Sequence, residues 1–349
     1  MSQQVNNYDF AYSVGVVRAL ENFLLNQNEV ERMMLAKDAK DAFRILNETD
    51  YADNKVGIDN PADFQKVLNE GLIDIKKRLD NITPNKEIIN ILWHFYDFHN
   101  IKTIMKAKLS GKKYEEIEHL LMADMGAIPV EALRVFIIEE KDTSFGLSWD
   151  KAESFLKEKI RRCEWTYEKG KRNPQIIDLY LDQKMMKLAH KIARDYGNEF
   201  LHKYIKILID LTNIRLMFRM KSQNKSQELY EMATMWDGTI PHTKFINAYK
   251  QSLSEFPATM SATPYANIVE KGYKAYTEED SFLELEKGTE NYLTDYIKQA
   301  KLKPFGPEPL IAYFLAKKNN ALLIRMLLIS KLNNIDPEEI RGRLRQLYS

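Results

Sequence analysis

Residues 97–117 read DFHNIKTIMKAKLSGKKYEEI, which is typical of a charged amphipathic helix that runs into a short break. Similar text returns at 210–230 as DLTNIRLMFRMKSQNKSQELY and at 320–340 as NALLIRMLLISKLNNIDPEEI. The second copy starts 113 residues after the first, and the third starts 223 residues after it. A repeat of about a third of the chain has the size of a small domain rather than of a solenoid motif.

The apolar positions of the first copy keep their register in the other two copies. All six fall on apolar residues in the second copy, and Lys318 is the one exception in the third. Basic residues coincide at two further positions. This match strengthens the case for a true repeat, because any two amphipathic helices share an apolar stripe but need not share basic positions. The six apolar positions are Leu92, Phe95, Phe98, Ile101, Ile104 and Met105, and the basic sets are Lys102, Arg215 and Arg325, then Lys108, Lys221 and Lys331.

The segments around these helices also repeat. Pro84 and Pro307 occupy equivalent positions before a long helix, and proline is tolerated in a first helical turn. The stretch TDYAD at 49–53 is echoed by TPYAN at 263–267, although the middle copy lacks it. We therefore predict three similar helical domains, and a single irregular helical domain with coincidental similarity is the alternative. The predicted domains span 1–125, 126–238 and 239–349.

Composition supports an all-α fold. Glycine (13) and proline (11) are scarce in the 349 residues, and helix-forming residues abound. A net charge of +1 argues against a dedicated nucleic-acid binder, and a single cysteine, Cys163, excludes an internal disulfide framework. The first residues lack a signal-peptide pattern, and the longest apolar run near the C-terminus is too short for a membrane span of about 20 residues. We therefore expect a soluble chain with no direct membrane span.

Periodicity predicts a helix near the start, with Tyr12, Val16, Ala19, Leu20 and Phe23 on its apolar face and Asn7 or Asp9 as its cap. Further helices are predicted between breaks rich in glycine, proline and asparagine. Their ranges are Lys37–Leu46, Pro61–Leu79, Lys86–Leu109, Trp149–Glu168, Ile176–Arg194, Glu199–Met220, Thr243–Phe256, Tyr292–Ala300, Leu310–Leu332 and Pro337–Leu347.

No catalytic or cofactor motif is evident. The sequence lacks a phosphate-binding loop, a dinucleotide fingerprint and a helical histidine pair of zinc spacing. Asp97 and Asp210 occupy matching positions, where the third copy has Asn320, and no nucleophile or base accompanies them. We expect these acids to have a structural role, each beside Phe98 or Leu211 and bonded across to a neighbouring helix. We therefore predict no enzyme activity, no cofactor and no metal site.

The repeated cations are the candidate site. Lys102 and Lys106 share one helix edge, Arg215 and Arg219 repeat this pair, and Arg325 stands alone in the third copy. A solvated helix edge explains any one of them. If the three domains close around an axis, however, Lys102, Arg215 and Arg325 would form a basic triangle. We hypothesise that all five bind an acidic partner, with their charges favouring orientation and capture.

Both ends of the chain carry a family resemblance. FAYSVGVVRALENFLL at 10–25 and FGPEPLIAYFLAKKNNALLIRMLLISKLNNIDPEEIRGRL at 305–344 resemble the opening and the ending of the central-stalk C subunit of V-type and A-type ATPases, which is equivalent to the eukaryotic d subunit. The middle, through DLTNIRLMFRMK, is a weaker match. Val16 departs from the pattern, since relatives often have an arginine there, and 139–175 is not distinctive.

The resemblance implies a funnel of three helical domains with pseudo-threefold symmetry. It implies a non-catalytic rotor subunit, peripheral on the cytoplasmic face of the membrane, that binds the central shaft subunits and the proteolipid ring. Gly306 and Pro307 are assigned to the helix start of the third domain. The alternative is a helical-repeat scaffold or adaptor that binds a partner helix or peptide along an open arc. Closure around an axis distinguishes the two.

Overall fold

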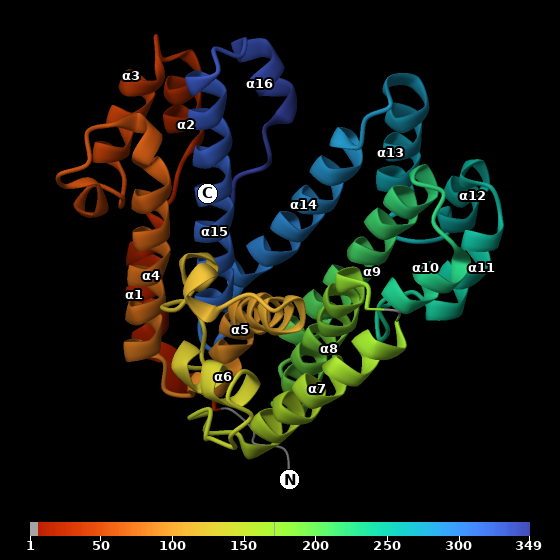
Figure 1. Cartoon of the computed structure of the whole chain (residues 1–349). Coiled ribbons are helices and arrows are strands. Elements are labelled where there is room, and N and C mark those ends of the chain that lie inside the picture. The colour runs from red at the N-terminus through yellow and green to blue at the C-terminus, as the bar shows by residue number, and fades with distance from the viewer. Residues whose placement is uncertain (1–5, 171) are drawn as a thin grey trace. The chain divides into compact units, whose positions relative to one another are not determined.

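The computed structural model describes residues 6–170 and 172–349, which form sixteen α-helices, several short 3-10 turns and no β-strand (Figure 1). The predicted all-α class is confirmed. The described residues divide into two compact units. We call 85–269 the central unit, and 6–84 together with 270–349 the terminal unit.

The central unit is built from helices that follow one another along the chain. The long helix α5 packs against α8, and α8 packs against α7 and α9. The helix α13 begins in this unit and ends in the other. The helices are α5 (Lys86–Ser110), α6 (Val130–Ile137), α7 (Asp150–Lys169), α8 (Pro174–Asp195), α9 (Glu199–Ser222), α10 (Gln227–Ala233), α11 (His242–Lys250), α12 (Phe256–Met260) and α13 (Ala266–Glu279).

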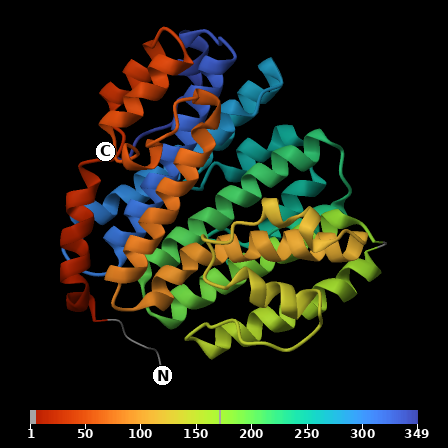
Figure 2. The ribbon, with the colours of Figure 1, turned by 60° about the vertical axis from the view of Figure 1, so that its left-hand side comes forward.

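The terminal unit joins the two ends of the sequence. Its long helix α15 packs against α1, α2, α3 and α4, so that red and orange segments lie beside the blue one in Figures 1 and 2. One apolar core contains side chains from both ends. The helices are α1 (Ala11–Glu21), α2 (Gln27–Leu35), α3 (Ala39–Arg44), α4 (Phe64–Ile82), α14 (Leu283–Lys298), α15 (Glu308–Leu332) and α16 (Pro337–Arg343).

The three predicted long helices are α5, α9 and α15. Asn85 and Asn198 cap the first two, since each side chain accepts a hydrogen bond from a backbone N–H of the first turn. Before α15, Gly306 adopts a positive φ of 99° and Pro307 is the capping residue. The assignment of these two residues to the helix start is confirmed. Of the six apolar positions that define the repeat in the first copy, five are buried and Phe95 is half-buried.

The first helix turns a different side to the core than predicted. Its buried apolar residues are Phe10, Val14 and Val17, whereas Tyr12 is 73% exposed and Phe23 is 57% exposed. The prediction was wrong because this segment is apolar on both sides, so that periodicity fits either face. The predicted caps were wrong as well, because Asn6 caps a 3-10 turn that precedes α1.

Other differences concern helix ends and short helices. The predicted helix 243–256 breaks after Lys250, the predicted helix 292–300 is the end of the longer α14, and the last helix ends at Arg343. The prediction missed α2, α6, α10, α12 and α13. Most of these helices are too short to show a periodic pattern over a full window.

Candidate partner-binding surfaces

Two polar side chains of α5 bind the loop that precedes α6. The Asn100 amide accepts from the Met122 backbone N–H at 2.8 Å and donates to the Met122 carbonyl at 3.2 Å. Asp97 accepts from the Ile128 N–H at 3.0 Å and contacts His94 Nδ1 at 2.8 Å. Both side chains are fully buried, so these bonds satisfy groups that water cannot reach.

The same arrangement recurs on α9, with the loop that precedes α11. Asn213 bonds both backbone groups of Met235, at 2.8 and 2.9 Å. Asp210 accepts from the N–H groups of Thr239 and Ile240, at 3.0 and 3.1 Å, and from the Tyr265 hydroxyl at 3.0 Å. Burial raises the pKa of the Asp210 carboxyl, and these hydrogen bonds oppose the rise.

These bonds explain why Asp97 and Asp210 occupy matching positions in the first two copies of the repeat. The carboxylates of Asp97 and Asp210 accept from backbone N–H groups, so the predicted structural role is confirmed. The predicted partner was wrong, because these donors lie in loops and not on a neighbouring helix. The loops themselves were not predicted. Their signal is a second repeat, DMGAIP at 124–129 and WDGTIP at 236–241, in which glycine, isoleucine and proline coincide.

A lysine at the end of each long helix contacts the segment that closes a short helix. Lys221 Nζ donates to the Gln251 carbonyl at the end of α11, and Lys331 Nζ to the Ala36 carbonyl at the end of α2, both at 2.7 Å. Lys108 pairs at 2.8 Å with Glu140, just beyond α6. Lys221 and Lys331 therefore make equivalent contacts, whereas Lys108 pairs with two carboxylates, that of Glu140 and, at 2.5 Å, that of Glu164 in α7.

The five predicted partner-binding cations lie on the three long helices. Lys102 and Lys106 form ion pairs with Asp182 and Asp178 of α8, at 2.7 and 2.6 Å. Both lysines keep some exposure, 23% and 41% of the side chain. The structure therefore gives these two cations partners inside the chain that the sequence did not reveal.

The three arginines divide between the two units. Arg215 and Arg219 belong to α9 of the central unit, and both side chains are engaged in interactions. Arg325 belongs to α15 of the terminal unit, and its half-buried side chain leaves Nε without a hydrogen-bond partner. Four of the five cations therefore belong to the central unit and one belongs to the terminal unit.

The cation hypothesis missed an exposed apolar face on α1 and the residues beside it. We call Tyr8, Tyr12, Gly15, Ala19 and Phe23 the α1 outer face, and all five are exposed. The Tyr8 ring contacts Phe305 at 5.1 Å between centroids, and the neighbouring Leu302 is 85% exposed. Scattered exposed apolar residues are ordinary, but a contiguous group marks an interaction site.

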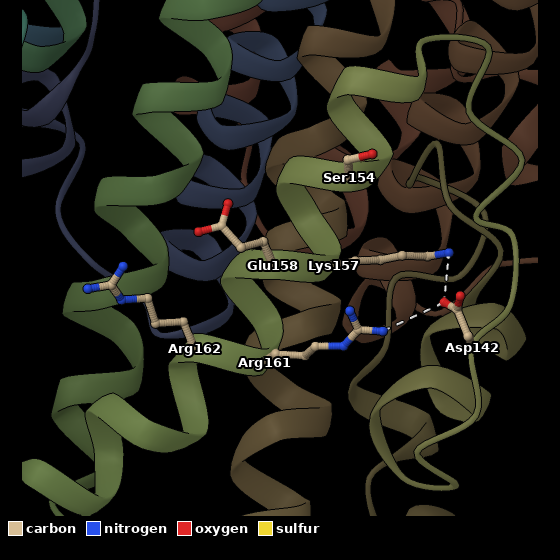
Figure 3. Close-up of a pocket in the computed structure, with 6 residues that line it drawn as sticks. All are labelled: Asp142, Ser154, Lys157, Glu158, Arg161 and Arg162. Carbon is tan, nitrogen blue, oxygen red and sulfur yellow. Dashed lines mark ion pairs between the residues drawn. The ribbon is translucent and has the colours of Figure 1, made fainter.

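A hollow of about 610 Å³ lies along α7, and its lining is charged (Figure 3). Lys157 and Arg161 reach to Asp142 at 3.0 and 3.8 Å, whereas Arg162 and Glu158 point away from Asp142. Such a lining of mutually paired charges differs from the mostly apolar lining of a small-molecule pocket.

Neither a metal cluster nor a membrane-spanning helix occurs among residues 6–170 and 172–349. No group of three or more His, Cys, Asp or Glu ligands converges in these ranges. His190 and His202 bring their Nε2 atoms within 2.8 Å, but without a third ligand of these types. No helix in the same ranges is long and apolar enough to cross a bilayer.

Known proteins match the chain along nearly its whole length. Residues 13–343 match the family model described as ATP synthase (C/AC39) subunit. The V-type sodium ATPase C subunit of Enterococcus hirae is 25% identical, covering 95% of this chain and 97% of its own length. The A-type ATP synthase C subunits of Methanocaldococcus jannaschii and Methanococcoides burtonii are each 24% identical, covering 96% and 99% of this chain and 86% and 96% of their own lengths.

Proposed function

Because the chain belongs to the ATP synthase (C/AC39) subunit family, whose members are stalk subunits and not the catalytic ones, we propose that it couples the central shaft of a rotary ATPase to the membrane proteolipid ring. In this proposal it sits on the cytoplasmic face of the membrane as a peripheral subunit. It serves ATP-driven ion transport or ATP synthesis without chemistry of its own. The family resemblance read from the two ends of the sequence is confirmed.

The observation that carries the proposal is a cycle of contacts between the three predicted domains. Lys108 of 1–125 contacts Glu140 of 126–238, and Lys221 of 126–238 contacts Gln251 of 239–349. Lys331 of 239–349 contacts Ala36, which returns to the first domain. The last of these contacts joins the two ends of the sequence within the terminal unit. A cyclic order of the three domains requires such a contact.

The proposed role fits the way these helices are packed. A part that transmits torque must not unwind under load, and packed protein interiors deform little. The Asp97 and Asp210 bonds hold the loops against α5 and α9, and the terminal unit ties both ends of the sequence into one core. A rigid wall of three such domains would suit the end of a coiled-coil shaft.

Two sets of residues supply the proposed contacts. Burial of the α1 outer face would provide affinity, since apolar contact area supplies most of the binding free energy. The cations Lys102, Arg215 and Arg325 would orient the partner, with each exposed ion pair contributing about 0–1 kcal/mol. For Lys102, the partner would share a charge that Asp182 already engages.

A charge swap separates the two roles of Lys102. In Lys102→Asp with Asp182→Lys, the ion pair between α5 and α8 is restored with reversed polarity. We expect wild-type stability together with weaker partner binding, measured by thermal unfolding and by co-purification. Wild-type co-purification of the swapped chain would show that Lys102 serves only the internal ion pair.

A pull-down from membranes tests the function itself. The tagged full chain is expressed in its own cells, the membranes are solubilised in mild detergent, and the co-purified proteins are identified by mass spectrometry. We expect shaft subunits and the proteolipid to be recovered together. Recovery of neither, from membranes that contain an assembled ATPase, would exclude the proposed coupling role.

A further inference from the structure

The helix α8 carries its charges on two different sides. Its acids Asp178 and Asp182 face α5, where they form the ion pairs described above. Its lysines Lys184 and Lys187 have no carboxylate within ion-pair distance in the part of the chain that the structure describes. Asp178 and Asp182 are therefore neutralised by α5, while these two lysines form no ion pair of their own.

The neighbouring helix α7 adds two more cations to the same place. Burial, and after it the charges of Lys187, Lys159 and Arg162, lower the pKa of Lys184. We call these four residues the α7–α8 basic cluster. Glu158 is the acid beside it, and it pairs with Lys159 at 2.5 Å. The charges of Arg162 and Lys187 also lower the pKa of Glu158, so this one acid is shared among three of the four cations. With Glu158 counted, four positive charges and one negative charge leave the cluster at +3.

Aromatic rings hold two of these ammonium groups in place. Lys184 Nζ lies 4.8 Å from the centroid of the Tyr180 ring, and Lys159 Nζ lies 5.2 Å from that of Phe155. Both contacts are within the range of cation–π attraction. The Tyr180 hydroxyl beneath the cluster is buried without a hydrogen-bond partner. Two of the four cations are thus held by ring contacts before any ligand arrives, which lowers the entropy lost on binding.

We propose that the α7–α8 basic cluster binds an acidic segment of a partner protein. Charge complementarity carries the assignment, since several cations that lack partners in the chain fit several carboxylates. Glu158 and the paired Asp142 interrupt the positive surface, which suits carboxylates at fixed positions better than a uniform sheet of lipid headgroups. This contact is additional to the shaft and ring contacts proposed above, and it does not depend on them.

The cluster has a stability signature as well. Like charges that crowd together lower the stability of the folded chain, so their removal should not weaken the fold. Glutamate at position 184 is attracted to Lys159 and Arg162, where Lys184 is now repelled, whereas glutamate at position 187 loses the attraction of Glu158. These effects oppose each other, so the double variant is expected to unfold close to the wild-type temperature, while its ligand affinity falls.

The experiment measures binding of a fluorescent poly-glutamate peptide to the full chain by anisotropy, across a salt series. The test variant is K184E/K187E, and K184Q/K187Q removes the charge without reversing it. The matched control is K112E/K113E, which changes the net charge equally at two exposed lysines of the same unit. Inorganic phosphate and phosphatidylserine vesicles are added as separate competitors, because either could supply an anion without a protein.

We expect K184E/K187E to weaken peptide binding by at least about tenfold, K184Q/K187Q by less, and the control by less than about twofold. Equal losses in the test variant and the control would overturn the proposal, because the peptide would then report only net charge. Displacement by millimolar phosphate would also overturn it. So would vesicle binding that requires Lys184 and Lys187, because it would assign the cluster to lipid.

Discussion

At the scale of single residues, the loops before α6 and α11 depend on two glycines. A Cβ on Gly238 would lie 2.1 Å from Asp210 Oδ1, and one on Gly126 would lie 2.3 Å from Asp97 Oδ1. Neither carboxylate can move away without losing hydrogen bonds, because the Ile128 N–H holds Asp97 and the Thr239 and Ile240 N–H groups hold Asp210. Glycine is therefore required at both positions for close approach rather than for an unusual φ.

This close approach predicts opposite effects of two glycine-to-alanine changes. Gly238→Ala should lower the free energy of unfolding by about 1–3 kcal/mol, because Asp210 must move from its donors. Gly15→Ala is the matched control, since its Cβ would meet nothing within 4 Å in the exposed face of α1. That variant should gain up to about 1 kcal/mol from helix propensity. Urea unfolding measures both, and equal stability of the two variants would contradict the account.

Lys317 predicts a pH dependence in the terminal unit. Its ammonium group is 1% exposed, it pairs with Asp50, and it lies over the Tyr51 ring. Burial lowers the pKa of Lys317 to about 8, against the opposing attraction of Asp50. An unfolded lysine titrates near 10.4. Between these two values the unfolded chain binds more protons than the folded chain, so the stability rises with pH.

The contribution of Lys317 to the pH dependence of stability is isolated by comparing the wild type with Lys317→Met. From pH 8 to about 10.5, the free energy of unfolding of the wild type should rise relative to the variant, by on the order of 3 kcal/mol at most. Other titrating groups cancel in the difference. A difference that stays constant or falls over this range would show that Lys317 is not forced toward its neutral form by burial.

At the scale of elements, two of the aligned lysines, Lys221 and Lys331, are each expected to stabilise the end of one short helix. The ammonium of Lys221 bonds the carbonyl that closes α11, and that of Lys331 bonds the carbonyl that closes α2. Methionine keeps most of the stem but removes the donor. Loss of about 1 kcal/mol should therefore raise amide exchange by roughly fivefold at the end of one short helix only.

Hydrogen exchange by mass spectrometry checks this prediction in both variants. Lys221→Met should loosen His242–Lys250 and leave Gln27–Leu35 unchanged, and Lys331→Met should do the reverse. Each variant is thus the control for the other. Faster exchange throughout both units, or no change in either helix, would argue against equivalent roles for the repeated lysines.

The elements also show what the sequence could predict. The three long helices were placed to within two residues at either end, because each has a sustained apolar period and clear breaks. The side of α1 was not predictable, since both sides are apolar and only tertiary packing chooses between them. The bonds from Asp97 and Asp210 to loops about 30 residues away follow from packing that no local window contains.

The candidate site was predicted only in part, because local spacing shows which residues share a helix face but not which helix packs against that face. Helical spacing correctly placed Lys102 and Lys106 on one edge of α5, since residues four apart share a helix face. It could not place Asp178 and Asp182 opposite them, because that requires α8 to pack against α5 in a particular register. The basic cluster of α7 and α8 was missed because its charges come from two helices.

At the scale of the whole molecule, the central proposal is one helical module used three times. Asn100 and Asn213 make the same bonds, and the aligned lysines contact equivalent segments, with the third contact returning to the start of the chain. A closed arrangement would present similar walls to a shaft at every angle. It would also leave no free end to unwind, which is what a rotating coupling requires.

The most direct test is an experimental density map of the chain held in its assembled ATPase. If one helical module is used three times, 86–110, 199–222 and 308–332 will superpose on one another by successive thirds of a turn about one axis, with the shaft end on that axis and the proteolipid ring at one face. Three helices in unrelated environments, or a shaft that binds away from any common centre, would contradict it.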